Sequence, residues 1–301
     1  MAEATVSTLR RWVQRSGQIL TVAALIFFAR ELVLQWGKVS HWRPSGAQFV
    51  LLISLAIGYA AALLLLAWNW SAILRRLIGP VLPAGPLLQS YTKTQIAKYV
   101  PGNVMHYVTR HVYLRDYGLE HRAIASAAFL EAISLPIAAM LAIALMVPFS
   151  GFAELATFAI RPDLTLIAAI LSIVTGAIIY AYFSGTHRYV PTVCYVLGRA
   201  VAFMLWQGLL FGLIIYSVSG TFVVFAIPVA IFAWLVGFVT PGAPGGVAVR
   251  EVLIVELLQD AAPNEEVFIA ALLFRLVTTL GDVTLYSFGE LAFQVRIKAK
   301  P

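Results

Sequence analysis

The chain has 301 residues, of which 61% are hydrophobic and only 12% are charged, and its mean hydropathy is +0.87. Soluble domains carry about 25% charged residues, so the composition excludes a soluble protein and indicates an all-α, polytopic membrane protein. The net charge of +7 comes from basic residues between apolar segments, which favours loops facing anionic lipid over nucleic-acid binding. Cys194 is the only cysteine, which excludes an internal disulfide and a cysteine-based metal cluster.

A transmembrane helix needs about 20 mostly apolar residues, and about seven segments meet that requirement. In chain order they are 17–36, 47–70, 123–148, 163–184, 196–219, 222–240 and 266–293. The first follows a basic N-terminus and lacks a small-residue cleavage site, so we interpret it as a retained signal anchor. Residues 71–122 are mixed and basic, and the apolar stretch 243–258 is too short to span alone.

The distribution of Lys and Arg predicts the orientation of these spans. The basic N-terminus, residues 71–122 and the basic tail are expected on the cytoplasmic side, which places both termini there. The connection 149–162 and the acidic segment 260–266 are expected outside, although Lys38 and Arg43 in the predicted outer loop 37–46 oppose this scheme. Residues 222–258 would then form a hairpin that enters from outside and returns.

Two proline-glycine sequences interrupt the apolar pattern, KYVPGN at residues 98–103 and TPGAPGG at residues 240–246. Such sequences cannot continue a helix, so we expect broken or re-entrant helices at about 93–117 and 241–258. In each case an arginine follows nine residues after the first proline, Arg110 and Arg250. Helices that start at the two breaks would direct their N-terminal N–H groups toward one anion-binding region. The alternative is that the loops are structural kinks and the matched spacing is a coincidence.

Five charged residues lie in or beside apolar runs: Glu131, Arg250, Glu251, Arg275 and Asp282. Each charge costs about 2.5–3.5 kcal/mol at the centre of a bilayer, so these groups must pair with one another or reach water. One interpretation is a pair of arginines that binds phosphate in bidentate geometry, with carboxylates that hold the arginines or carry protons. The alternative is a purely structural network of ion pairs between helices.

Several chemical motifs are absent from the sequence. There is no G-x-x-x-x-G-K-[ST] loop for ATP, and no Asp pair of the kind that holds Mg²⁺ in transferases. The histidines lack metal-ligand spacing, and we interpret His106, His111 and His121 as interfacial side chains. We therefore expect no catalytic residue, no metal and no cofactor.

Residues 98–103 with Arg110, then Glu131, then PGGVAVRE at residues 244–251 with Arg275, resemble the flippase-like transmembrane family. That family includes the membrane region of lysylphosphatidylglycerol synthase and proteins encoded beside glycosyltransferases. The resemblance covers about 15–295, and Ala248 stands where the family usually has glycine. It implies movement of a lipid between leaflets of a bacterial or archaeal cytoplasmic membrane. The soluble aminoacyl-transfer domain of the synthases has no counterpart here.

The function expected from these patterns is a flippase-like transporter of an anionic phospholipid or a polyprenyl-phosphate-linked lipid. The expected partners are membrane lipids and a glycosyltransferase or other lipid-modifying enzyme, without nucleic acid. Two alternatives stay open: an integral-membrane lipid transferase, and a non-transporting scaffold that docks a glycosyltransferase through residues 71–122. The expected head-group site comprises Lys98, Tyr99, Pro101, Gly102, Asn103, Arg110, Glu131, Pro241, Gly242, Pro244, Gly245, Gly246, Arg250, Glu251, Arg275 and Asp282.

Overall fold

The computed structural model describes Val33 and residues 42–79, 82–99, 104–149, 190–240 and 244–298, and over these ranges it contains helices and no strand. Four helices are long and apolar enough to cross a membrane: α2 (Gly46–Ile78), α5 (His121–Met146), α7 (Val190–Ser219) and α10 (Asn264–Lys298). They confirm the predicted spans 47–70, 123–148, 196–219 and 266–293. By the length and composition of the helices that the structure describes, the chain is a helical integral membrane protein.

The predicted span at 222–240 is wrong, because that region forms the shorter helix α8 (Ala226–Val239) of 14 residues. At about 1.5 Å per residue such a helix is about 21 Å long, whereas the hydrocarbon core is about 30 Å thick. Gly220, with a φ of 72°, turns the chain before α8, and Pro241 follows its C-cap residue Thr240. The predicted spans 17–36, apart from Val33, and 163–184 lie outside the described residues, so the count of seven is not confirmed.

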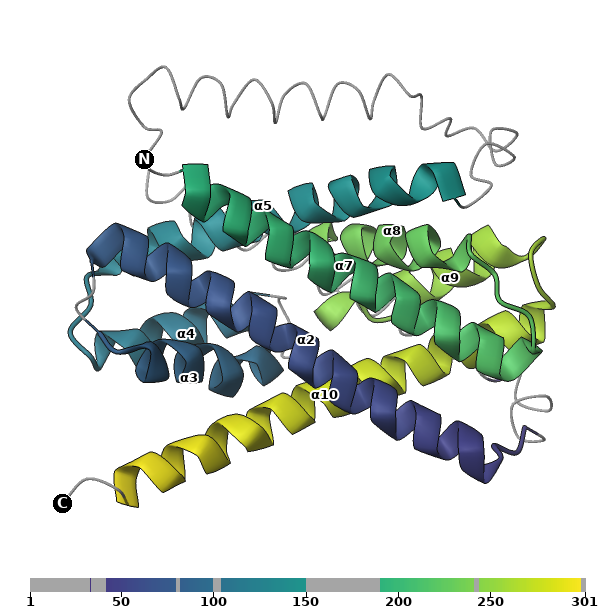
Figure 1. Ribbon diagram of the computed structural model, residues 1–301, viewed down its shortest axis with the longest axis horizontal. Coiled ribbons are helices and arrows are strands. Elements are labelled where there is room, and N and C mark those ends of the chain that lie inside the picture. The colour runs from purple at the N-terminus through teal and green to yellow at the C-terminus, as the bar shows by residue number, and fades with distance from the viewer. Residues whose placement is uncertain are drawn as a thin grey trace, which may run out of the picture.

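Short helices occupy the two proline-glycine regions. The first region holds α3 (Ala84–Thr94), the 3₁₀ helix η1 (Gln95–Tyr99) and α4 (Met105–Arg115); the second holds η5 (Pro244–Gly246) and α9 (Val249–Leu258). A further 3₁₀ turn, η2 (Val147–Phe149), ends α5. Figure 1 shows α3 and α4 packed together near one end of the bundle, and α8 beside α9 farther along it.

The start of α2 illustrates how local sequence begins a helix. The hydroxyl of Ser45 accepts a hydrogen bond from the Gln48 N–H, and the Gln48 side chain accepts one from the Ser45 N–H, which is a complete capping box. The Gln48 amide also donates to the carbonyl of Ser217 at the end of α7. The helix ends at Gly79, whose φ of 74° favours glycine.

A close crossing of α2 and α10 lies at the centre of the bundle (Figure 1). A β-carbon on Gly281 would come within 2.6 Å of Tyr59 Cδ1 and 2.8 Å of the Ala56 carbonyl oxygen. Small residues allow such close approach of membrane helices. The crossing carries the next residue, Asp282, into the interior, where it is fully buried.

Candidate functional site

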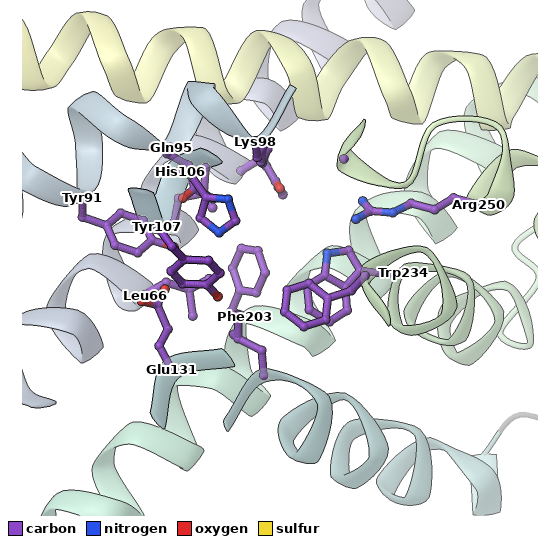
Figure 2. A pocket seen from close by; sticks show the side chains of 15 residues that line it. Leu66, Tyr91, Gln95, Lys98, His106, Tyr107, Glu131, Phe203, Trp234 and Arg250 are labelled. Carbon is purple, nitrogen blue, oxygen red and sulfur yellow. The ribbon is translucent and has the colours of Figure 1, made fainter. Parts of the chain in front are cut away.

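A cavity of about 50 Å³ lies inside the bundle, between the two proline-glycine regions. Its wall includes residues of η1, α4, α5, α7, α8 and α9 (Figure 2). One water molecule needs about 10–15 Å³ of such space, so the cavity has room for several waters or a small polar group. The aromatic part of its wall consists of Tyr59, Tyr91, Tyr107, Phe203, Trp234 and Phe238.

The first region contributes Lys98 to this wall, paired with Asp282 of α10. The ammonium Nζ lies 2.8 Å from Asp282 Oδ1 and 2.7 Å from Oδ2. Tyr99 donates its hydroxyl to Asp282 Oδ2 at 2.6 Å. Asp282 is fully buried. It therefore binds Lys98 and Tyr99, the last two residues of η1 before the proline-glycine dipeptide.

Arg110 lies behind the wall and is paired with Glu131 of α5. Its Nη1 is 2.6 Å from Glu131 Oε2, and neither side chain is more than 5% exposed. Its guanidinium also lies 4.2 Å from the ring centre of Tyr91 and 4.5 Å from that of Trp70, within the range of cation–π attraction. The structure thus gives the charge of Arg110 a partner, and only Glu131 of this pair lines the cavity.

Arg250 lies in the first turn of α9 and lines the cavity directly. Its guanidinium is 5.7 Å from the ring centre of Trp234. Among the described residues it has no carboxylate within ion-pair distance, and its buried Nε has no hydrogen-bond partner. Within the described part of the chain, Arg250 is therefore the cation of this wall that has no carboxylate partner.

Two glycines make room for the Arg250 side chain. A β-carbon on Gly246 would lie 2.5 Å from Arg250 Nε, and one on Gly237 of α8 would lie 2.9 Å from the same atom. Larger residues at either position would therefore displace the guanidinium. Gly246 is among the residues expected from the sequence, whereas Gly237 is not; the only sequence signal for Gly237 is a single glycine in an apolar helix.

Arg275 of α10 anchors the second proline-glycine segment. Its Nη1 donates to the Gly245 carbonyl at 2.9 Å and lies 4.0 Å from Glu251 Oε1. Its guanidinium is also 5.5 Å from the ring centre of Tyr99, and a β-carbon on Gly245 would lie 3.4 Å from that ring. Tyr99 and Gly245, which are far apart in the sequence, therefore meet at this point.

The predicted site residues fall into three groups. Those that line the cavity are Lys98, Glu131, Gly245 and Arg250. Those that lie behind the wall, or begin η5, are Tyr99, Arg110, Pro244, Gly246, Glu251, Arg275 and Asp282. Those outside the described residues are Pro101, Gly102, Asn103, Pro241 and Gly242.

The interpretation of His106 as an interfacial side chain is wrong. His106 is only 7% exposed and lines the cavity, and its Nδ1 has no hydrogen-bond partner among the described residues. The hydroxyl of the adjacent Tyr107 is also buried, with no hydrogen-bond partner in the described part of the chain. A sequence signal existed, since His106 lies four residues before Arg110 and thus on the same helix face.

The chain matches no protein-family model, and a search of curated proteins found no match.

Proposed function

We propose that the protein moves an anionic lipid between the leaflets of its membrane, with Arg250 binding the head-group phosphate. The observation that carries this proposal is a guanidinium without a carboxylate partner among the described residues, at a cavity inside a bundle of membrane-spanning helices. A buried unpaired charge is costly, and guanidinium matches phosphate oxygens in bidentate geometry. A phosphate that enters the cavity would remove that cost.

The geometry of α8 and α9 supports a re-entrant hairpin as the route to the cavity. At about 1.5 Å per residue, α9 is about 15 Å long and α8 about 21 Å, so neither crosses a bilayer core of about 30 Å. The two helices pack against each other, and the N-cap of α9, Ala248, makes no side-chain cap hydrogen bond. We propose that the hairpin brings the N-terminal N–H groups of α9 to the head group, with both chain termini on the cytoplasmic side.

The flippase-like family that the sequence resembles fits this proposal. The Arg110–Glu131 pair and the Arg275–Glu251 contact then serve to hold the two segments around the cavity. Lys98, paired with Asp282, adds a second cation to the wall. Movement would be downhill or coupled to an ion, because the sequence carries no ATP-binding loop.

The test is leaflet exchange of a fluorescent anionic phospholipid in vesicles that contain the purified full chain. We expect Arg250→Ala to slow exchange by about tenfold or more, since hydrogen bonds to charged groups contribute about 1.5–3 kcal/mol. Arg250→Lys keeps the charge but not the bidentate geometry, and should retain part of the rate. Exchange by folded Arg250→Ala at the wild-type rate would exclude this role.

A matched control is Arg199→Ala. Arg199 also lies on a membrane-spanning helix, with its guanidinium 5.5 Å from the ring centre of Tyr195, but it does not line the cavity. We expect this variant to exchange lipid at the wild-type rate. Product formation in detergent, without a bilayer, would instead favour the transferase alternative.

A further inference from the structure

The charges around the cavity cancel in pairs with one exception. Three cation–carboxylate pairs surround it, with closest N···O distances of 2.7 Å, 2.6 Å and 4.0 Å. They are Lys98 with Asp282, Arg110 with Glu131, and Arg275 with Glu251. Each pair contributes no net charge. Among the described residues, only Arg250 therefore contributes net charge to the cavity wall. Counted over the residues that the structure describes, the wall carries one positive charge in excess.

This balance limits the charge of the ligand. A head group with one negative charge neutralises Arg250 and leaves the three pairs intact. A diphosphate would bring further negative charge close to Glu131 and Asp282, whose own charges are already matched. Uncompensated charge in a low-dielectric site is costly, so a singly charged phosphodiester fits the wall better than a diphosphate.

The end of the cavity opposite Arg250 is lined by polar groups, and its charged side chains, Lys98 and Glu131, are each paired (Figure 2). Gln95, His106 and Tyr107 line it, and the Nδ1 of His106 and the hydroxyl of Tyr107 lack partners among the described residues. Buried polar groups normally have hydrogen-bond partners, so these two atoms indicate an absent ligand or water. A ligand hydroxyl donates and accepts and can therefore serve both.

An ammonium group fits this end poorly. The nearest carboxylate, Glu131, is already neutralised by Arg110 at 2.6 Å. Lys98 lines the same cavity, so an additional cation would meet repulsion without an unpaired anion. This end, whose charges are already paired, thus favours hydroxyl groups over amines.

We propose that the cavity selects a singly charged phosphodiester that carries a polyol, with the phosphate on Arg250 and the hydroxyls on His106 and Tyr107. This proposal rests on the proposed function and narrows its substrate class. Two sources share this chemistry: a glycerophospholipid with a polyol head group, and a polyprenyl-phosphate-linked sugar. Zwitterionic, aminoacylated and diphosphate-linked lipids lie outside the class.

Binding is measured on the purified full chain in detergent, as the thermal shift produced by short-chain probes. The polyol phosphodiesters are dihexanoyl phosphatidylglycerol and a short prenyl-phosphate-linked glucose, which distinguish the two sources. The comparison probes are dihexanoyl phosphatidylethanolamine, lysyl-phosphatidylglycerol of the same chain length, and a short prenyl diphosphate. We expect at least one polyol phosphodiester to bind about tenfold more tightly than every comparison probe, which corresponds to about one hydrogen bond or charge contact.

Tyr107→Phe tests the hydroxyl contact with little risk to folding, because the hydroxyl bonds to no described residue. This variant should lose most of the preference for the polyol while still binding phosphate. Tyr113→Phe on the same helix is the control, since its hydroxyl donates to Gln89 outside the cavity; it should keep the preference.

The outcomes separate this inference from the proposed function. Equal binding of all anionic probes, or an unchanged preference in Tyr107→Phe, would overturn the polyol assignment while leaving lipid exchange through Arg250 in place. Absence of binding by every anionic probe to the folded wild type would overturn both. Preference for the zwitterionic or lysyl probe would overturn the charge balance.

Discussion

The side chain of Arg250 passes over Gly237 of the neighbouring helix, so closely that a β-carbon on this glycine would lie 2.8 Å from the arginine Cγ. Contacts this short do not occur for real β-carbons, so the arginine reaches the cavity only because residue 237 is glycine. The position of the Arg250 guanidinium therefore depends on a residue that carries no charge itself.

Gly237→Ala should thus impair lipid exchange almost as much as loss of Arg250 itself. The added methyl group would push the guanidinium away from its place in the wall, while a helical alanine is intrinsically favourable. The measurement is leaflet exchange in vesicles together with thermal unfolding. Gly198→Ala in α7 is the control, because its β-carbon would meet no atom within 4 Å; comparable exchange by both variants would contradict the prediction.

Ala248 is the one described non-glycine residue with a positive φ, at 66° with a ψ of −40°. Such backbone conformations cost about 1–3 kcal/mol for residues with a β-carbon. Glycine removes this strain, but it also makes the unfolded chain more flexible, which offsets about 0.4–1 kcal/mol of the gain in stability. We therefore expect Ala248→Gly to raise the free energy of unfolding by about 1 kcal/mol. Thermal unfolding in detergent measures this, and Ala62→Gly in the interior of α2 should lower stability instead. A lower melting temperature for Ala248→Gly would show that the residue is not strained.

The Arg110–Glu131 pair is expected to matter for stability far more than an exposed pair. Glu131→Gln would leave a fully buried guanidinium without its counter-charge, and breaking a buried pair from one side costs about 3–5 kcal/mol. The matched variant is Glu290→Gln, since the Lys93–Glu290 pair has N and O 2.9 Å apart with side chains 23% and 32% exposed; exposed pairs contribute about 0–1 kcal/mol. Chemical or thermal unfolding compares the stability of the two variants. Equal losses of stability would contradict the expectation that the buried pair contributes more.

The contact between His111 and His121 predicts a dependence of stability on pH. Their Nε2 and Nδ1 atoms lie 2.8 Å apart, and burial, then the neighbouring His121 and Arg115, lower the pKa of His111. The folded state therefore binds this proton less readily than the unfolded state, whose histidine pKa is about 6.5. Stability should be unaffected above that value and should fall as the pH drops below it.

The measurement is the melting temperature across this range in the wild type and in His111→Gln, which cannot be protonated there. We expect the wild type to lose more stability on acidification than the variant. Parallel pH profiles for the two proteins would show that protonation of His111 does not destabilise the folded state.

Sequence reasoning succeeded where a property depends on neighbours along the chain. Apolar runs longer than about 20 residues predict membrane-spanning helices, and four such predictions are confirmed by α2, α5, α7 and α10. It failed at residues 222–240, where the apolar run is long but the turn before Ala226 shortens the helix to 14 residues. Composition alone does not place such a turn.

Arg110 and Arg250 show most clearly what the sequence does not predict, because each follows its proline-glycine motif at the same spacing. The sequence by itself determined that both arginines would lie near broken backbone in an apolar surrounding. Only the tertiary structure decided that Glu131 from α5 neutralises Arg110, whereas among the described residues no carboxylate forms an ion pair with Arg250. The physical reason is that a buried charge is matched by whichever helix packs against it, and that packing depends on residues far away in the chain.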